Sequence, residues 1–130
     1  MTMNVVEATT SYETWLRSRA FVVERDLEAK HAAMAQAALP FMRATFYRFV
    51  QLWDEHASEL AIARAQRVLG VGDLHVENFG TWRDSEGRLI WGINDFDEAY
   101  PLPFTLDLVR LATSCHLAIR ERHLSVRAKE

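Results

Sequence analysis

The sequence predicts an α+β fold class that is mainly helical and carries a small β-hairpin. Residues 11–66 place apolar side chains at helical intervals among many strong helix formers. Residues 67–98 instead hold two short apolar runs on either side of a turn, which is the pattern of paired strands. Residues 104–122 return to helical spacing. No glycine or proline lies between Phe41 and Leu69, so nothing there marks a linker, and we expect one domain over the whole chain.

The first helical segment is expected to begin after a short irregular end. Residues 1–10 are predicted to be frayed and disordered, as chain ends commonly are. Ser11 or Thr10 is the candidate N-cap, because short polar side chains accept hydrogen bonds from the free N–H groups at a helix start. Residues 25–39 are rich in alanine, and they fit either a continuation of the first helix or a second one. Pro40 predicts a boundary, since the residue before a proline is disfavoured in the helical region.

An aromatic helix is predicted to follow this boundary. Its apolar side chains recur at helical spacing, as in a helix that packs into a core, and they are Met42, Phe46, Phe49, Val50 and Trp53. Arg43 lies among them, and two interpretations of it stay open. Its planar guanidinium could contact a phosphate, although such an arginine is more often a paired or solvated surface residue. Residues 54–66 alternate acids and bases among alanines and are predicted to form an exposed connecting helix.

The last helix is predicted over residues 104–122, after an extended connector formed by residues 100–103. Thr105 is its candidate N-cap. Apolar side chains that share one face are expected to be buried, and they are Leu108, Leu111, Ala112, Cys115 and Ile119. Cys115 is therefore interpreted as a small buried hydrophobic residue and not as a nucleophile.

The stretch between Gly70 and Tyr100 is strongly acidic and contains the candidate site. It holds seven acidic side chains against two arginines. Carboxylates that converge must be neutralised by a cation or a proton. Strand-like residues come before Asp73 and before Asp95, and residues 84–87 have the composition of the turn that would join the two strands. Each aspartate is thus expected at the end of a short strand, where loops commonly carry chemistry.

The spacing of three polar side chains in this stretch fits phosphoryl transfer. Asp73 precedes Asn78 by five positions, and Asp95 follows Asn78 by seventeen. Phosphoryl transfer needs one carboxylate to orient the acceptor hydroxyl, while a side-chain amide and a second carboxylate hold magnesium on the nucleotide phosphates. The alternative interpretation of Asp73 and Asn78 alone is an ordinary turn, where both residue types are favoured.

These residues also carry a resemblance to known families. The segment GDLHVEN at residues 72–78 resembles the catalytic loop of kinase-like phosphotransferases of the aminoglycoside and choline kinase type, and INDFD at residues 93–97 resembles their metal-binding strand end. Together with LDLVRLA at residues 106–112, the set resembles the bacterial family called domain of unknown function 2252, which is thought to be kinase-like. The resemblance implies that the chain corresponds to part of the C-lobe of the protein-kinase-like fold.

The resemblance also implies a role for each matching residue. Asp73 corresponds to the catalytic, base-like aspartate, and His75 occupies a position near the transferred phosphate. Asn78 and Asp95 correspond to metal ligands, and Asp97 is a candidate second carboxylate ligand, since alternate residues of an extended segment face the same side. The implied cofactors are Mg²⁺ and ATP.

Two further expectations come from the resemblance. Asp107 matches a buried aspartate that braces the catalytic loop from the following helix, whereas its alternative interpretation is a favourable charge at a helix N-terminus. The glycine-rich stretch and strand-borne lysine of the resembled family lie C-terminal to the catalytic loop, and this chain contains neither. We therefore expect an N-terminal piece of a longer protein, whose partners are the missing remainder and an unknown phosphoryl acceptor.

Composition narrows the function classes. The net charge of −3 and the pI of about 5.9 argue against a general nucleic-acid or anionic membrane surface. A single cysteine cannot form an intramolecular disulfide, and the chain has neither an apolar run long enough to span a bilayer nor a signal sequence, so a cytoplasmic location is the expectation.

Three functional hypotheses stay open. The first is an ATP- and magnesium-dependent phosphotransferase whose activity needs the missing part. The second is a module that binds a hard cation or another ligand through its carboxylate oxygens without catalysis. The third is a structural or regulatory fragment that docks through apolar surface.

Overall fold

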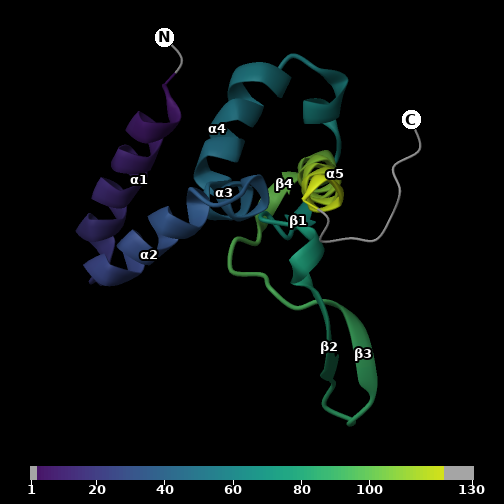
Figure 1. The fold of residues 1–130 in the computed structure, drawn as a ribbon. Coiled ribbons are helices and arrows are strands. Elements are labelled where there is room, and N and C mark those ends of the chain that lie inside the picture. The colour runs from purple at the N-terminus through teal and green to yellow at the C-terminus, as the bar shows by residue number, and fades with distance from the viewer. Residues whose placement is uncertain (1–2, 122–130) are drawn as a thin grey trace. The chain divides into compact units, whose positions relative to one another are not determined.

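The computed structural model describes residues 3–121 and has the α+β class that the sequence predicts (Figure 1). The chain divides into two compact units, Met1–His56 and Ala57–Glu130. The described part of the first unit is helical, and the second holds two separate two-stranded antiparallel sheets and a long helix. The fold is therefore mainly helical, but it contains one more strand pair than expected. Within residues 3–121, no helix is both long and apolar enough to cross a membrane.

The first unit begins with helix α1, Val5–Arg19, which starts earlier than predicted. Asn4 is its N-cap, and the cap is reciprocal. The Asn4 side chain accepts the backbone N–H of Glu7 at 2.9 Å, and the Glu7 carboxylate accepts the N–H of Asn4 at 2.9 Å. The N-cap prediction at Ser11 or Thr10 is therefore wrong, because this capping box lies nearly two turns upstream of both. The predicted frayed end is wrong for residues 5–10, which are helical, and residues 1–2 lie outside the described residues.

Three further helices follow, α2 (Glu24–Met34), α3 (Ala38–Ala44) and α4 (Phe46–Ala57). Residues 20–23 separate α2 from α1, which decides between the two alternatives that the sequence left open. Pro40 does not mark a boundary, because it is the third residue of α3, where its missing N–H would have no partner within the helix. The predicted aromatic helix is interrupted at Thr45, whose backbone leaves the helical region at φ −123° and ψ 37°.

The connection to the second unit is less helical than predicted. Helix α4 ends at Ala57, and only a short 3₁₀ helix, η1 (Ala61–Arg64), follows before the first strand. The prediction of one exposed helix over residues 54–66 is therefore wrong beyond Ala57.

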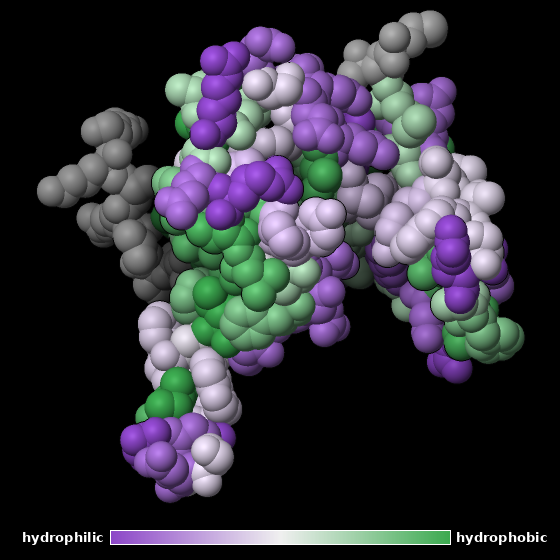
Figure 2. Space-filling model, turned by 180° about the vertical axis from the view of Figure 1, so that it is seen from behind, coloured by the Kyte–Doolittle hydropathy of each residue, from purple (hydrophilic) through white to green (hydrophobic). Residues whose placement is uncertain are grey.

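The second unit contains both sheets. Strand β1 (Arg67–Gly70) pairs with β4 (Tyr100–Pro103), so the predicted extended connector before the last helix is also a strand. Strand β2 (Phe79–Arg83) pairs with β3 (Leu89–Ile93), and this is the predicted hairpin. Figure 2 shows that the tip of the hairpin is hydrophilic, whereas the surface next to its base is hydrophobic.

The Asp84 side chain accepts three of the hydrogen bonds that close the hairpin turn. Oδ1 of Asp84 accepts the backbone N–H groups of Glu86 and Arg88, each at 2.9 Å, and Oδ2 accepts Nε of Arg88 at 2.7 Å. Gly87 has a positive φ of 77°, which glycine adopts without the strain of a Cβ. The turn predicted from the composition of residues 84–87 is therefore confirmed, with aspartate as the hydrogen-bond acceptor and glycine at the positive φ.

Helix α5, Phe104–Arg120, buries a different face from the predicted one. Its N-cap residue is Pro103, and Thr105 instead donates its hydroxyl to the carbonyl of Ile62. The buried positions are Leu106, Asp107, Arg110, Ser114 and Ala118, whereas Leu108 of the predicted apolar face is 54% exposed. The helix packs on β1, β4 and two 3₁₀ helices. Its polar side chains turn inward because they bond the loop that follows β1.

Candidate functional site

Acidic side chains from two loops of the second unit line one pocket. The pocket has a volume of about 180 Å³ and is lined by Val71, Asp73, Asp95, Asp97 and Glu98. Asp73 follows strand β1, and the three other acids follow strand β3. The structure therefore brings together three of the predicted site residues. Glu98 was not predicted as a site residue, although it belongs to the same acidic run in the sequence.

Arg110 of α5 fixes the carboxylate of Asp73. Its Nε donates to Oδ1 of Asp73 at 2.8 Å, and its Nη2 donates to the same oxygen. Arg110 is 1% exposed, whereas the Asp73 side chain is 23% exposed. Burial lowers the pKa of Arg110, and the attraction of the Asp73 carboxylate opposes this shift. Arg110 follows Asp107 by three positions and so lies on the same side of a helix, which was the available sequence signal, but sequence reasoning missed it.

Asp107 braces the loop on which Asp73 lies. Its Oδ2 accepts the backbone N–H of Val71 at 2.8 Å, and its Oδ1 accepts that of Gly72 at 2.9 Å. The bracing contact that the resemblance implied for Asp107 is therefore present. Because both bonds go to main-chain groups next to Asp73, they fix the position of the loop independently of its side chains.

Two glycines allow this loop to pass close to its neighbours. Gly72 has φ 89°, and a Cβ added there would clash with the carbonyl oxygen of Glu98. A Cβ on Gly70 would lie 2.8 Å from Oδ2 of Asp107. Glycine at both positions is therefore needed for the close approach of the loop to Asp107 and to the opposite wall of the pocket.

His75 is placed away from the pocket surface. It is buried, and its Nδ1 accepts the backbone N–H of Glu77 at 3.2 Å, which caps the 3₁₀ helix η2, Val76–Asn78. Because Nδ1 is the acceptor, the proton of the neutral imidazole is assigned to Nε2. His75 is not among the residues that line the pocket. The structure thus gives it a contact within the loop, and its catalytic role stays a prediction.

Asn78 also bonds within the loop. Its Oδ1 accepts the backbone N–H of His75 at 2.6 Å, and its carbonyl oxygen accepts the N–H of Asn94 at 3.0 Å. The side chain is buried and does not line the pocket. Asn78 therefore ties the loop after β1 to the end of β3, and its role as a metal ligand stays a prediction.

Arg43 lies on α3, where it is exposed to solvent. It belongs to the first unit, whereas all the residues that line the acidic pocket belong to the second. The phosphate contact proposed for Arg43 stays a prediction.

The acidic pocket offers carboxylate oxygens of the kind that bind a magnesium ion. Carboxylate oxygens are the ligands that Mg²⁺ prefers, and this ion is commonly held by one or two carboxylates together with phosphate oxygens and water. Asp95 and Asp97 fit this donor type, and Oδ1 of Asp95 accepts the N–H of Asp97 at 3.3 Å. Asn78 is not among the residues that line the pocket, and its Oδ1 accepts the N–H of His75. In the part of the chain that the structure describes, no three His, Cys, Asp or Glu side chains are grouped so that they could hold a metal ion by themselves.

A family model described as "Uncharacterized protein conserved in bacteria (DUF2252)" matches residues 19–130. The match includes the acidic pocket, Arg110 and Asp107. Comparisons with curated proteins and with solved structures give no match.

Proposed function

We propose that this chain, which belongs to the DUF2252 family of bacterial proteins, carries the acceptor and metal side of a kinase-like phosphotransferase site. The proposed reaction is the transfer of a phosphoryl group from ATP to an acceptor hydroxyl in the presence of Mg²⁺. The acidic pocket of Asp73, Asp95 and Asp97 is the proposed site.

The main support for the proposal is that helix α5 fixes both the side chain of Asp73 and the backbone that precedes it. Arg110 fixes its carboxylate, and Asp107 fixes the backbone of the two residues before it. A carboxylate that only formed part of a turn would need neither support. Phosphoryl transfer relies mainly on positioning and on electrostatic stabilisation, so a fixed carboxylate that faces a pocket is the component it requires.

The charges of the pocket indicate why a cation would be required. The acids Asp73, Asp95, Asp97 and Glu98 line it. Arg110, the cation that bonds Asp73, is buried and is not among the lining residues. Nucleotide phosphates would be repelled by these carboxylates unless a divalent cation lay between them. When bound, Mg²⁺ would supply the charge that neutralises the phosphate oxygens.

The proposal assigns metal binding and acceptor orientation to different carboxylates. Asp95 and Asp97 would hold the metal ion through carboxylate oxygens. Asp73, kept in place by Arg110, would accept a hydrogen bond from the acceptor hydroxyl and orient its oxygen towards the phosphoryl group. Its proton acceptance would be favoured only late in the transfer, because the guanidinium of Arg110 stabilises the ionised carboxylate.

The test is nucleotide binding in the presence and absence of magnesium. We expect ATP to raise the thermal unfolding midpoint of the chain only when Mg²⁺ is present, and Asp95→Asn to abolish this effect. Asp54→Asn is the matched control, since it removes the same charge from an exposed position of α4. Equal stabilisation of both variants by ATP would contradict the proposal.

The acidic lining also favours a second candidate function, the binding of a hard cation without nucleotide. Calorimetric titration with Mg²⁺ and Ca²⁺ separates the two. Saturable cation binding that Asp95→Asn removes, combined with no effect of ATP at any magnesium concentration, would support this second function over phosphoryl transfer.

A further inference from the structure

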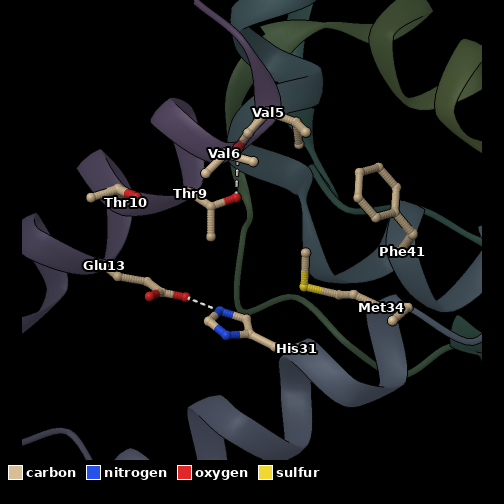
Figure 3. A pocket seen from close by; sticks show the side chains of 9 residues that line it. Val5, Val6, Thr9, Thr10, Glu13, His31, Met34 and Phe41 are labelled. Atoms are coloured by element: carbon tan, nitrogen blue, oxygen red, sulfur yellow. Dashed lines mark hydrogen bonds and ion pairs between the residues drawn. The ribbon is translucent and has the colours of Figure 1, made fainter.

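The first unit contains a second pocket, which is chemically unlike the acidic one. It has a volume of about 370 Å³ and lies between α1, α2 and the start of α3 (Figure 3). All the residues that line it come from this one unit. Small-molecule sites typically have volumes of about 300–1,000 Å³, so the pocket is large enough for a small ligand.

Most of its wall is apolar. Val5 and Val6 of α1 lie on one side, and Met34 and Phe41 lie on the other (Figure 3). A thioether and an aromatic ring adapt to aliphatic as well as aromatic partners. The body of a ligand that fills this pocket would therefore be a hydrocarbon group.

One buried carboxylate interrupts the apolar wall. Glu13 is 6% exposed and lines the pocket. Its Oε1 lies 2.6 Å from Nε2 of His31, which is a hydrogen bond (Figure 3). Its Oε2 lies 3.9 Å from Nη1 of Arg17, which is beyond hydrogen-bond distance. Because a carboxylate has acceptor sites on both oxygens, Glu13 can accept a further donor.

Two neighbouring cations, Arg17 and Lys30, interact with the charge of Glu13 without donating a hydrogen bond to it, and Arg17 forms an ion pair with Glu13 at 3.9 Å. Arg17 donates from Nε and Nη2 to the two carboxylate oxygens of Glu24, at 3.0 and 2.9 Å. The ammonium of Lys30 interacts electrostatically with Glu13, but it lies over the Tyr12 ring, 5.3 Å from the ring centroid. A carboxylate in such surroundings is stabilised most by a cation that also donates a hydrogen bond to it.

We propose that this pocket binds a small primary amine with an aliphatic or aromatic body, whose ammonium group donates to the Glu13 carboxylate while the body contacts Val6, Met34 and Phe41. The inference is independent of the phosphotransferase proposal, because it rests on other residues in the other unit. A ligand with an anionic head would meet the Glu13 charge at close range and is disfavoured.

Three ligands of matched shape test the proposal by NMR titration of the full chain. Benzylamine carries the cationic donor, benzyl alcohol a neutral donor, and benzoate an anion. We expect saturable shifts of the backbone amides around the pocket with benzylamine, binding about tenfold weaker for benzyl alcohol, and no saturable shifts with benzoate. Equal affinity for all three, or no saturable binding of benzylamine, would overturn the proposal.

Variants locate the binding. Glu13→Gln should remove the preference for benzylamine over benzyl alcohol. Ala35→Phe should fill the pocket and abolish the binding of both, whereas Ala33→Phe, on the same stretch of chain but not among the lining residues, should leave it unchanged. Circular dichroism would show whether Glu13→Gln unfolds the chain. In that case the comparison of Ala35→Phe with Ala33→Phe still tests whether the amine binds in this pocket. Binding that persists in Ala35→Phe refutes the assignment to this pocket.

Discussion

At the scale of single residues, the ion pair between Asp73 and Arg110 joins stability to the candidate chemistry. The guanidinium is almost fully buried, so it depends on a fixed counter-charge, and Asp73 supplies one at the edge of the acidic pocket. A structural role and a positioning role therefore coincide in one contact. They can be separated by measuring stability and ligand binding in the same variants.

Asp73→Asn is expected to reduce the free energy of unfolding by about 1–3 kcal/mol, because it weakens the hydrogen bonds of a buried charge. The loss stays below the about 3–5 kcal/mol typical of broken buried ion pairs, since Asp73 is partly exposed to water. Urea denaturation measures it. Adding Arg110→Met should restore part of the loss, and strictly additive effects of the two substitutions would show that the pair is not coupled.

Two glycines with positive φ offer a matched comparison. Gly87→Ala, in the hairpin turn with nothing within 4 Å of the added Cβ, should cost only the conformational penalty of about 1–2 kcal/mol. Gly72→Ala adds a clash with the carbonyl of Glu98, so we expect about 2–4 kcal/mol. Chemical denaturation of both variants checks the difference. Equal losses would mean that the loop moves away from Glu98 without cost.

At the scale of elements, the hairpin turn should respond to acid. The Arg88 side chain and its backbone N–H, together with the N–H of Glu86, hold the pKa of Asp84 below its ordinary value of 3.8. The unfolded chain therefore binds more protons than the folded one just below that pH, and stability falls as the pH decreases there. We expect the amide signal of Arg88 to keep its folded shift at pH 4 and to lose it in more acidic solution. Asp84→Asn should remove this pH dependence.

The N-cap of α1 is also formed by residues close together in the sequence, Asn4 and Glu7. Asn4→Ala should lower the free energy of unfolding of the first unit by about 1 kcal/mol, since it removes the acceptor for the N–H of Glu7. Asn4→Ser keeps an acceptor and should cost much less. Helix content followed by circular dichroism during thermal unfolding measures both. No difference between alanine and serine would show that the cap does not contribute.

Which elements could be predicted depends on the range of the contacts that define them. The turn at Asp84 and the alternation in β3 are local, and the sequence predicted that hairpin. The pairing of β1 with β4 joins residues that are 30 to 36 positions apart, and only one of the two segments was predicted as a strand. The Asn4 capping box was also local, but its pattern of Asn followed three residues later by Glu was overlooked.

Helix α5 shows what periodicity alone does not predict. Its apolar stripe suggested a buried face containing Leu108, but the structure buries Asp107 and Arg110 instead. Both side chains bond groups that lie about 35 residues away in the chain, namely the amides of the loop and Asp73. Burial of charges is favourable only with such partners, and the spacing of residues within one helix does not reveal them.

The carboxylates of the candidate site could be predicted from the sequence, whereas Arg110, which fixes Asp73, was not predicted. Asp73, Asp95 and Asp97 do line one pocket, because the two strand ends that carry them meet. The side chains of Asn78 and His75 instead accept hydrogen bonds from main-chain N–H groups of their own loop. Buried polar groups need such partners.

At the scale of the whole molecule, several large apolar side chains are exposed. Leu89 and Trp91 of β3 are 67% and 69% exposed, and Leu108 of α5 is also exposed. Exposed apolar patches commonly mark surfaces that contact another molecule or that promote association. The hypothesis of a structural or regulatory fragment that docks through apolar surface stays a prediction. The exposed side chains provide positions at which it can be tested.

We expect the native chain to bind the hydrophobic dye ANS. A double substitution, Leu89→Thr with Trp91→Thr, should reduce the dye fluorescence at unchanged helix content, because it removes exposed apolar area from one strand. Glu86→Thr at the tip of the same hairpin is the control and should not change it. Dye fluorescence that is unaffected by the double substitution would place the binding surface elsewhere.

The open turn of the hairpin has a practical consequence. Nothing lies within 4 Å of the Cβ position at Gly87, and the strands on either side are held by their own antiparallel pairing, from Phe79 with Ile93 to Arg83 with Leu89. A short epitope tag or a spectroscopic label inserted at this point should leave both pockets undisturbed. The turn is therefore a convenient attachment site for immobilising the protein in ligand screens.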